Sequence, residues 1–88
     1  MYKRQLSHPV EKNDLVAHLH KNAPNKIGHL QVNNVQTNDG IKYLMENDNW
    51  LLIRPSGTEP VLRIYAEGRS KENVQTLMEY GRKIAENT

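Results

Sequence analysis

The fold of this 88-residue chain is decided by residues 50–67, which are Trp50-Leu51-Leu52-Ile53-Arg54-Pro55-Ser56-Gly57-Thr58-Glu59-Pro60-Val61-Leu62-Arg63-Ile64-Tyr65-Ala66-Glu67. The run 50–53 is apolar and the run 61–67 alternates between apolar and polar residues, so both have strand character. Residues 54–60 between them are rich in Pro, Ser, Gly and Thr, which favour turns. The stretch therefore predicts two neighbouring strands joined by a loop.

The composition of this loop also favours the binding of an anion. Arg54 carries a planar fork of donors that matches an oxyanion, and Ser56 and Thr58 carry hydroxyl donors. Gly57 allows the backbone to come close to a ligand, so that consecutive N–H groups can converge on it. Two interpretations stay open for residues 54–60 at this point, an ordinary connecting turn and an anion-binding loop.

Turn signals divide the rest of the central sequence into strands. Asn-Asp-Gly stands at residues 38–40 and Asn-Asp-Asn at residues 47–49, each before an apolar run. Within residues 27–37 the apolar alternation shifts by one position at Asn33-Asn34, which predicts a β-bulge or a bend. Three turns, counting the loop at residues 54–60, therefore connect four predicted strands.

The last predicted strand has one apolar face and one polar face. The alternation places Leu62, Ile64 and Ala66 on the core face and Arg63, Tyr65 and Glu67 on the wet face. From the wet face, Arg63 either reaches toward the loop or forms a cross-strand pair with a carboxylate, and both roles stay open.

Two helices are expected, one before the strands and one after them in the sequence. Ser7-His8-Pro9 can begin the first, which carries Leu15, Val16 and Leu19 on one side and stops at residues 23–25, Ala-Pro-Asn. Ser70 is the predicted N-cap of the second helix, with Glu72 in its first turn.

The apolar stripe of the second helix consists of Val74, Leu77, Met78, Gly81, Ile84 and Ala85. The elements together predict an α+β fold with two layers, in which a four-stranded, mainly antiparallel sheet carries both helices on one face.

Composition and length indicate one small soluble domain spanning residues 1–88. The net charge of +2 is too small for a nucleic-acid interface, and no apolar run approaches the ~18 residues of a membrane span. Residues 1–6 lack the apolar region of a signal peptide, and the absence of cysteine is compatible with the cytoplasm, the location we expect. His18 and His20 lie about 200° apart around a helix, so we expect no metal site.

Residues 54–60, followed by residues 61–68, resemble the phosphate-binding loop and following strand in the last domain of the α-D-phosphohexomutases. With Asp39-Gly40-Ile41-Lys42 and residues 50–53, the chain resembles the bacterial phosphomannomutase/phosphoglucomutase branch more than the phosphoglucosamine branch. The resemblance implies the TATA-binding-protein-like arrangement of that domain. It also implies that residues 1–88 are the C-terminal, phosphate-binding domain of a larger, four-domain enzyme.

The function implied by this resemblance is the interconversion of hexose 1-phosphate and hexose 6-phosphate through a bisphosphorylated intermediate. By the same resemblance, Arg54, Ser56, Gly57 and Thr58 hold the phosphate that is not being transferred. Arg63 and Glu59 are candidates for supporting roles, and for Glu59 two interpretations stay open: it orients Arg54 or Arg63, or it is solvated. The phosphorylated serine and the Mg²⁺ site of the family lie in other domains, so we expect no catalytic residue and no metal in this chain. The implied partners are hexose phosphate, hexose bisphosphate and the remaining domains.

Two other classes of function remain as alternatives. One is a stand-alone regulatory module that binds an anion or a partner. The other is an RNA-binding α+β sheet, which needs surface aromatic residues on its central strands, and for which Tyr43 and Tyr65 are the candidates.

Overall fold

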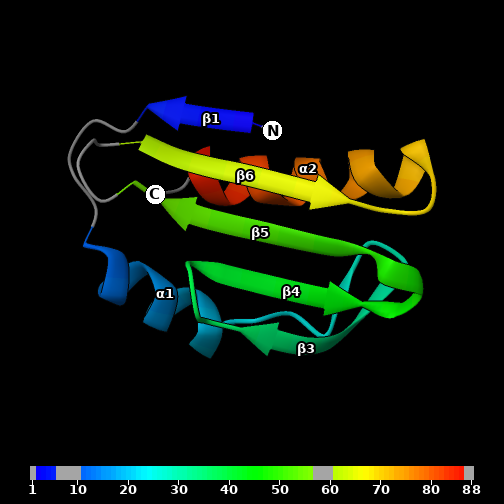
Figure 1. Ribbon diagram of the computed structural model, residues 1–88, viewed down its shortest axis with the longest axis horizontal. Coiled ribbons are helices and arrows are strands. Elements are labelled where there is room, and N and C mark those ends of the chain that lie inside the picture. Colours follow the sequence, from blue (N-terminus) through cyan, green and yellow to red (C-terminus); the bar gives the residue numbers. More distant parts are fainter. Residues whose placement is uncertain (1, 6–10, 57–60, 87–88) are drawn as a thin grey trace.

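The computed structural model describes residues 2–5, 11–56 and 61–86 (Figure 1). The elements along the chain are β1 (Tyr2–Gln5), α1 (Lys12–Lys21), β2 (Lys26–Ile27), β3 (Leu30–Gln36), β4 (Ile41–Met45), the 3₁₀ turn η1 (Glu46–Asp48), β5 (Trp50–Pro55), β6 (Val61–Glu67) and α2 (Lys71–Glu86). The strands form an antiparallel sheet in the order β1-β6-β5-β4-β3-β2.

The predicted α+β class with two layers is confirmed, but the strand count is wrong. The described part of the chain has six strands instead of four, because β1 and β2 were not expected. β1 is the polar stretch Tyr-Lys-Arg-Gln, which lacks the apolar alternation of a half-buried strand, and it pairs with the outer edge of β6. β2 is two residues long and pairs with the start of β3. Backbone pairing at a sheet edge leaves little trace in the side-chain pattern.

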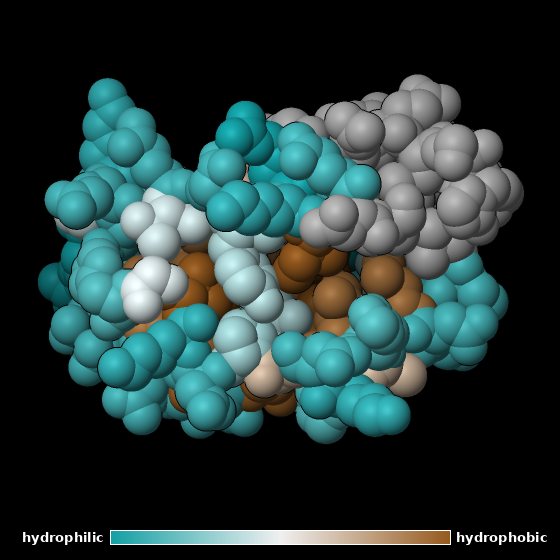
Figure 2. Space-filling view, turned by 180° about the vertical axis from the view of Figure 1, so that it is seen from behind, coloured by the Kyte–Doolittle hydropathy of each residue, from teal (hydrophilic) through white to brown (hydrophobic). Residues whose placement is uncertain are grey.

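The core lies on one face of the sheet, and both helices pack there. The core cluster contains, from β4, β5 and β6, the buried residues Ile41, Tyr43, Met45, Leu51, Ile53, Leu62 and Ile64. Leu15 and Leu19 of α1 and Leu77 and Ala85 of α2 belong to the same cluster. Seen from behind, the surface is mostly hydrophilic, and hydrophobic residues are visible in the recesses between polar side chains (Figure 2). The prediction that both helices lie on one face is confirmed.

Local signals in the sequence explain the ends of the helices. Ser70 is the N-cap of α2, since its Oγ accepts the N–H of Asn73 at 3.1 Å, as predicted. α1 begins at Lys12, and Glu11 caps it by accepting the N–H of Asp14 at 2.8 Å. The predicted start of this helix at residues 7–9 lies outside the described residues. The bulge expected at Asn33-Asn34 is confirmed, because the β3–β4 register shifts between Val32 and Asn34.

Tyr43 joins the sheet to both helices. Its ring is buried, its hydroxyl donates to the carbonyl oxygen of Leu19 at 3.4 Å, and it meets the ring of Tyr80 edge to face at 6.3 Å. Burial in this apolar site raises the pKa of Tyr43, since the charged phenolate would be poorly solvated there. Tyr43 therefore offers no surface for a base, which removes one of the two aromatic residues on which the RNA-binding alternative depended.

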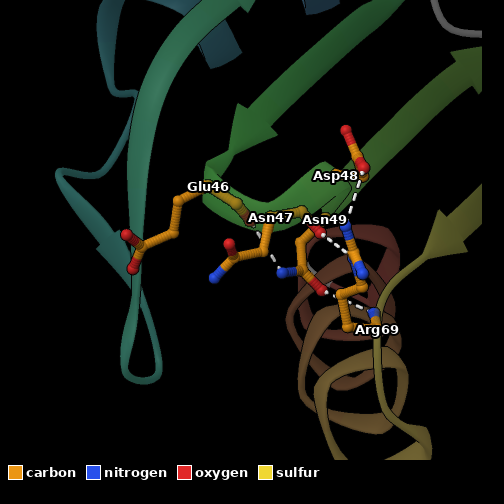
Figure 3. A network of polar contacts seen from close by, with 5 residues as sticks. All are labelled: Glu46, Asn47, Asp48, Asn49 and Arg69. Carbon is orange, nitrogen blue, oxygen red and sulfur yellow. Dashed lines mark hydrogen bonds and ion pairs between the residues drawn. The ribbon is translucent and has the colours of Figure 1, made fainter.

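Asn49 connects the β4–β5 turn to the start of α2 (Figure 3). The side chain is buried; its amide donates to the carbonyl oxygen of Glu46 at 2.8 Å, and its Oδ1 accepts the N–H of Arg69 at 3.2 Å. Oδ1 also lies 3.4 Å from the side-chain amide of Asn73. The turn itself requires positive φ at Asn47 and Asp48, a conformation that Asn and Asp adopt more readily than most residues. This end of the sheet is closed by hydrogen bonds.

Candidate functional site

The candidate site lies at the other end of β5, where the strand reaches Arg54 and Pro55 (Figure 1). The predicted pairing of the two flanking strands is confirmed, because β5 and β6 are antiparallel neighbours. The N–H of Ser56 donates to the carbonyl oxygen of Val61 at 2.9 Å, which closes the base of the loop. Gly57, Thr58 and Glu59 lie outside the described residues.

A recess of about 320 Å³ opens beside this strand end and is lined by Lys12, Asp39, Arg54, Pro55, Ser56 and Arg63. Its lining contains three cationic side chains and one carboxylate. A recess of about 510 Å³ along α2 contains one lysine and two glutamates. A recess of about 460 Å³ along α1 shares Lys12 and adds no other lysine or arginine. The recess at Arg54 is therefore the one whose charge best suits an anion.

One carboxylate joins two of the cations. The Oδ1 of Asp39 lies 3.4 Å from the Nε of Arg54 and 3.6 Å from the Nζ of Lys12. All three side chains are about half exposed, with relative exposures of 55%, 47% and 46%. Ion pairs this exposed contribute little to stability, because water and salt screen them. The charges therefore remain available to a ligand.

Gly40 holds the turn that carries Asp39 against β5. Its φ is +78°, and a Cβ at this position would clash with the carbonyl oxygen of Ile53 and lie 3.0 Å from the Cα of Arg54. Only glycine combines this backbone conformation with such a close approach. The contact fixes where Asp39 stands relative to Arg54.

Arg63 lies on the strand next to Arg54. Its directly opposite neighbours in the sheet are Arg54 on β5 and Lys3 on β1, so within the described residues the alternative of a cross-strand pair with a carboxylate is not met. Among the described residues, no ion pair of Arg63 is seen. The structure thus brings Arg54, Ser56 and Arg63 to one recess.

Lys12 and Asp39 were missed as members of this recess. Asp39 was interpreted as part of a turn signal, and Lys12 is an ordinary surface lysine in the first turn of a helix. No spacing rule connects the two positions, because the packing of α1 beside the β3–β4 turn brings them together.

Residues 9–83 match the family model described as phosphoglucomutase/phosphomannomutase, C-terminal domain. The chain belongs to the phosphoglucomutase/phosphomannomutase family. The matched part covers most of the chain and corresponds to the last domain of that family, in agreement with the resemblance seen at residues 54–68.

Relatives in this family have names from both branches. A probable phosphoglucosamine mutase of Methanosphaera stadtmanae is 48% identical over 52% of this chain and 10% of its own length. A phosphoglucomutase/phosphomannomutase of Thermococcus kodakarensis is 42% identical over 59% of this chain and 11% of its own length. A probable phosphoglucosamine mutase of Pyrococcus abyssi is 51% identical over 54% of this chain and 10% of its own length. The chain spans about a tenth of the length of these relatives.

The residues present do not fit the Mg²⁺ ion implied for the phosphoglucomutase/phosphomannomutase family. The described residues contain no cluster of three or more His, Cys, Asp or Glu side chains that could hold a metal. In the described lining of the recess, Asp39 is the one carboxylate, and two cations share its Oδ1. In the described part of the chain, no helix is long and apolar enough to span a membrane.

Proposed function

We propose that this chain is the C-terminal domain that binds the non-transferring phosphate of a sugar phosphate, and that Arg54, Ser56, Gly57 and Thr58 hold it. The observation that carries the proposal is the recess at the end of β5, whose lining includes three cationic side chains, one carboxylate and Ser56. Three cations and one carboxylate leave an excess of positive charge suited to a phosphate dianion.

The chemistry of such a site is recognition and not bond breaking. Each charge-assisted hydrogen bond to a phosphate oxygen contributes about 1.5–3 kcal/mol. A site that contacts only the phosphate accepts either end of a sugar bisphosphate, so the intermediate can turn over and present each phosphate in turn. Ser56 acts here as a donor to phosphate, because none of the described residues that line the recess is a histidine that could activate it as a nucleophile.

The whole protein, by this proposal, is a cytoplasmic enzyme that interconverts hexose 1-phosphate and hexose 6-phosphate through a bisphosphorylated intermediate. The phosphorylated serine and the Mg²⁺ that assists phosphoryl transfer belong to other domains. This domain closes over the bound substrate and excludes water from the reaction. The 88-residue chain alone therefore binds phosphate without turnover. The proposal also assigns the choice of sugar to residues outside this chain, which is supported by matches to relatives of both branches.

A titration of the chain with glucose 6-phosphate and mannose 6-phosphate, followed by nuclear magnetic resonance, tests the proposal. Affinity should be weak, on the order of millimolar, because the opposing walls of the cleft are absent. Amide shifts should centre on Ser56, Gly57 and Thr58 and should be nearly the same for both sugars.

Variants of Arg54 identify the residue on which binding depends. Arg54→Ala should remove most of the binding, and Arg54→Lys should keep part of it, because lysine restores the charge without the planar fork. Arg69→Ala is the matched control, since Arg69 also pairs with an aspartate in a turn, at 3.3 Å, but at the opposite end of the sheet. Binding that survives Arg54→Ala, or that is lost equally in Arg69→Ala, would contradict the proposal.

A further inference from the structure

We propose that Asp39 is a positioning residue for Arg54, whose guanidinium it holds by Nε so that the two terminal nitrogens are presented to the phosphate. This inference rests on the proposed function and assigns a role to a residue that the family resemblance did not place in the site. It starts from the 3.4 Å contact between the Oδ1 of Asp39 and the Nε of Arg54.

A guanidinium needs such a partner at this position because its surroundings are repulsive. Arg54 stands directly opposite Arg63 in the β5–β6 register, and like charges opposite each other in a sheet repel. Lys12 adds a third positive charge to the same recess. Asp39 is the one carboxylate among the described residues that line the recess, and it lies within 3.6 Å of both Lys12 and Arg54. Its charge offsets the repulsion and keeps these cations together while phosphate is absent.

The backbone around Asp39 makes it suited to orienting a side chain. Gly40 places the turn in direct contact with the backbone of β5 at Ile53 and Arg54. The carboxylate is therefore anchored to the same strand as the guanidinium that it holds. With Nε engaged, the terminal nitrogens of Arg54 still have four N–H donors, enough for a bidentate contact with phosphate.

The direction in which phosphate affinity changes when the Asp39 carboxylate is removed separates a positioning role from simple electrostatic repulsion. A carboxylate that only stands near a phosphate site repels the dianion, so its removal should tighten binding. A carboxylate that positions Arg54 gives the opposite result, because its removal lets the guanidinium move away from Arg63 and Lys12. We therefore expect Asp39→Asn to bind inorganic phosphate and glucose 6-phosphate about three- to ten-fold more weakly than the unmodified chain.

The matched control is Asp48→Asn, which removes a carboxylate from the second aspartate–arginine pair in the described part of the chain, Asp48–Arg69. Its affinity for phosphate should be unchanged. Asp39→Glu restores the charge on a longer side chain and should bind more tightly than Asp39→Asn. If Asp39→Asn loses the dispersed amide spectrum of a folded chain, the phosphate affinity of Asp39→Glu tests the positioning role in its place. Unchanged or tighter binding in folded Asp39→Asn, or no recovery in Asp39→Glu, overturns the proposal.

The same substitution in an Arg54→Lys background shows whether the effect passes through the guanidinium. Lysine has no Nε–H for Asp39 to hold, so Asp39→Asn should no longer weaken phosphate binding there. An equal weakening in both backgrounds would mean that Asp39 acts by another route. The Nε–H resonance of Arg54 gives a direct readout, and it should shift and exchange faster with water in Asp39→Asn.

Arg54→Ala distinguishes failure of this inference from failure of the proposed function. If Arg54→Ala leaves phosphate affinity unchanged, both fail, because Arg54 is then not a phosphate ligand. If Arg54→Ala weakens binding and Asp39→Asn does not, the phosphate site stands and only the positioning role of Asp39 is rejected.

Discussion

The two ends of β5 have similar residues but different arrangements. At the Trp50 end, Asp48 pairs with Arg69 at 3.3 Å; at the Arg54 end, Asp39 pairs with Arg54 at 3.4 Å. Each end also has a turn with positive φ, at Asn47 and Asp48 on one side and at Gly40 on the other. The first end is closed by the buried amide of Asn49 (Figure 3), whereas the second opens into a recess lined by charged side chains.

This difference separates stability from binding within one small domain. A buried amide that bonds to backbone groups is costly to remove, because its partners would remain buried without water. Half-exposed charges stabilise the fold little, and for the same reason they can exchange one partner for an anion. The Asn49 end is therefore expected to hold the fold together, and the Arg54 end to bind the ligand.

The largest effect is expected from Asn49→Ala, which should lower the free energy of unfolding by about 3 kcal/mol. It leaves the Arg69 N–H without its acceptor and removes one of the two N–H groups that donate to the Glu46 carbonyl. Urea denaturation measures this loss. Phosphate affinity of the folded chain should not change. Asn33→Ala, at an exposed position of β3, is the control and should change stability by less than about 0.5 kcal/mol. A similar loss in both variants would contradict the structural role of Asn49.

Gly40→Ala should lower both the stability of the fold and the affinity for phosphate, because the turn touches β5 at the binding end. A non-glycine residue at positive φ costs about 1–2 kcal/mol, and the Cβ would also push the turn away from Ile53 and Arg54. Gly28→Ala is the matched control, since Gly28 also has positive φ but its Cβ would meet the side chain of Thr76. Both variants should lose stability in urea, and only Gly40→Ala should weaken phosphate binding. Equal phosphate affinity in the two variants would mean that the turn at Gly40 does not contribute to phosphate binding.

Salt should weaken phosphate binding at the Arg54 end of β5 without lowering the stability that the Asn49 end provides. Raising the salt concentration from about 0.05 M to about 0.5 M shortens the screening length to a few ångströms and should weaken phosphate binding several-fold. The urea midpoint should change little, because the hydrogen bonds of Asn49 are buried. Parallel titrations and urea curves at several salt concentrations measure both quantities. A midpoint that falls together with the affinity would show that the charged recess also supports the fold.

The smallest effect is expected from Asp48→Asn. The ion pair between Asp48 and Arg69 is 87% and 68% exposed, so its removal should change the free energy of unfolding by less than about 0.5 kcal/mol. The same urea measurement applies. A loss as large as that of Asn49→Ala would mean that the ion pair, and not the buried amide, holds this end of the sheet.

Local patterns predicted a large part of the fold. The turns at residues 38–40 and 47–49, the bulge at Asn33-Asn34 and the cap at Ser70 depend on neighbours along the chain, and the structure has all of them. β1 and β2 could not be predicted, because a strand that adds to a sheet edge is defined by the strand beside it. Tyr43 could not be assigned to the core by its type alone, since tyrosine is common both inside and at surfaces.

The candidate site divides in the same way. The sequence by itself determined that Arg54 and Ser56 stand close together between two paired strands, because these residues are near neighbours in the chain and their chemistry depends on local spacing. Only the tertiary structure decided that Lys12 and Asp39 join them, since the packing of α1 and the contact of Gly40 with β5 bring together positions far apart in the chain. The physical reason is that hydrogen-bonding and turn preferences act over a few residues, whereas the position of a charge in a recess depends on how whole elements pack.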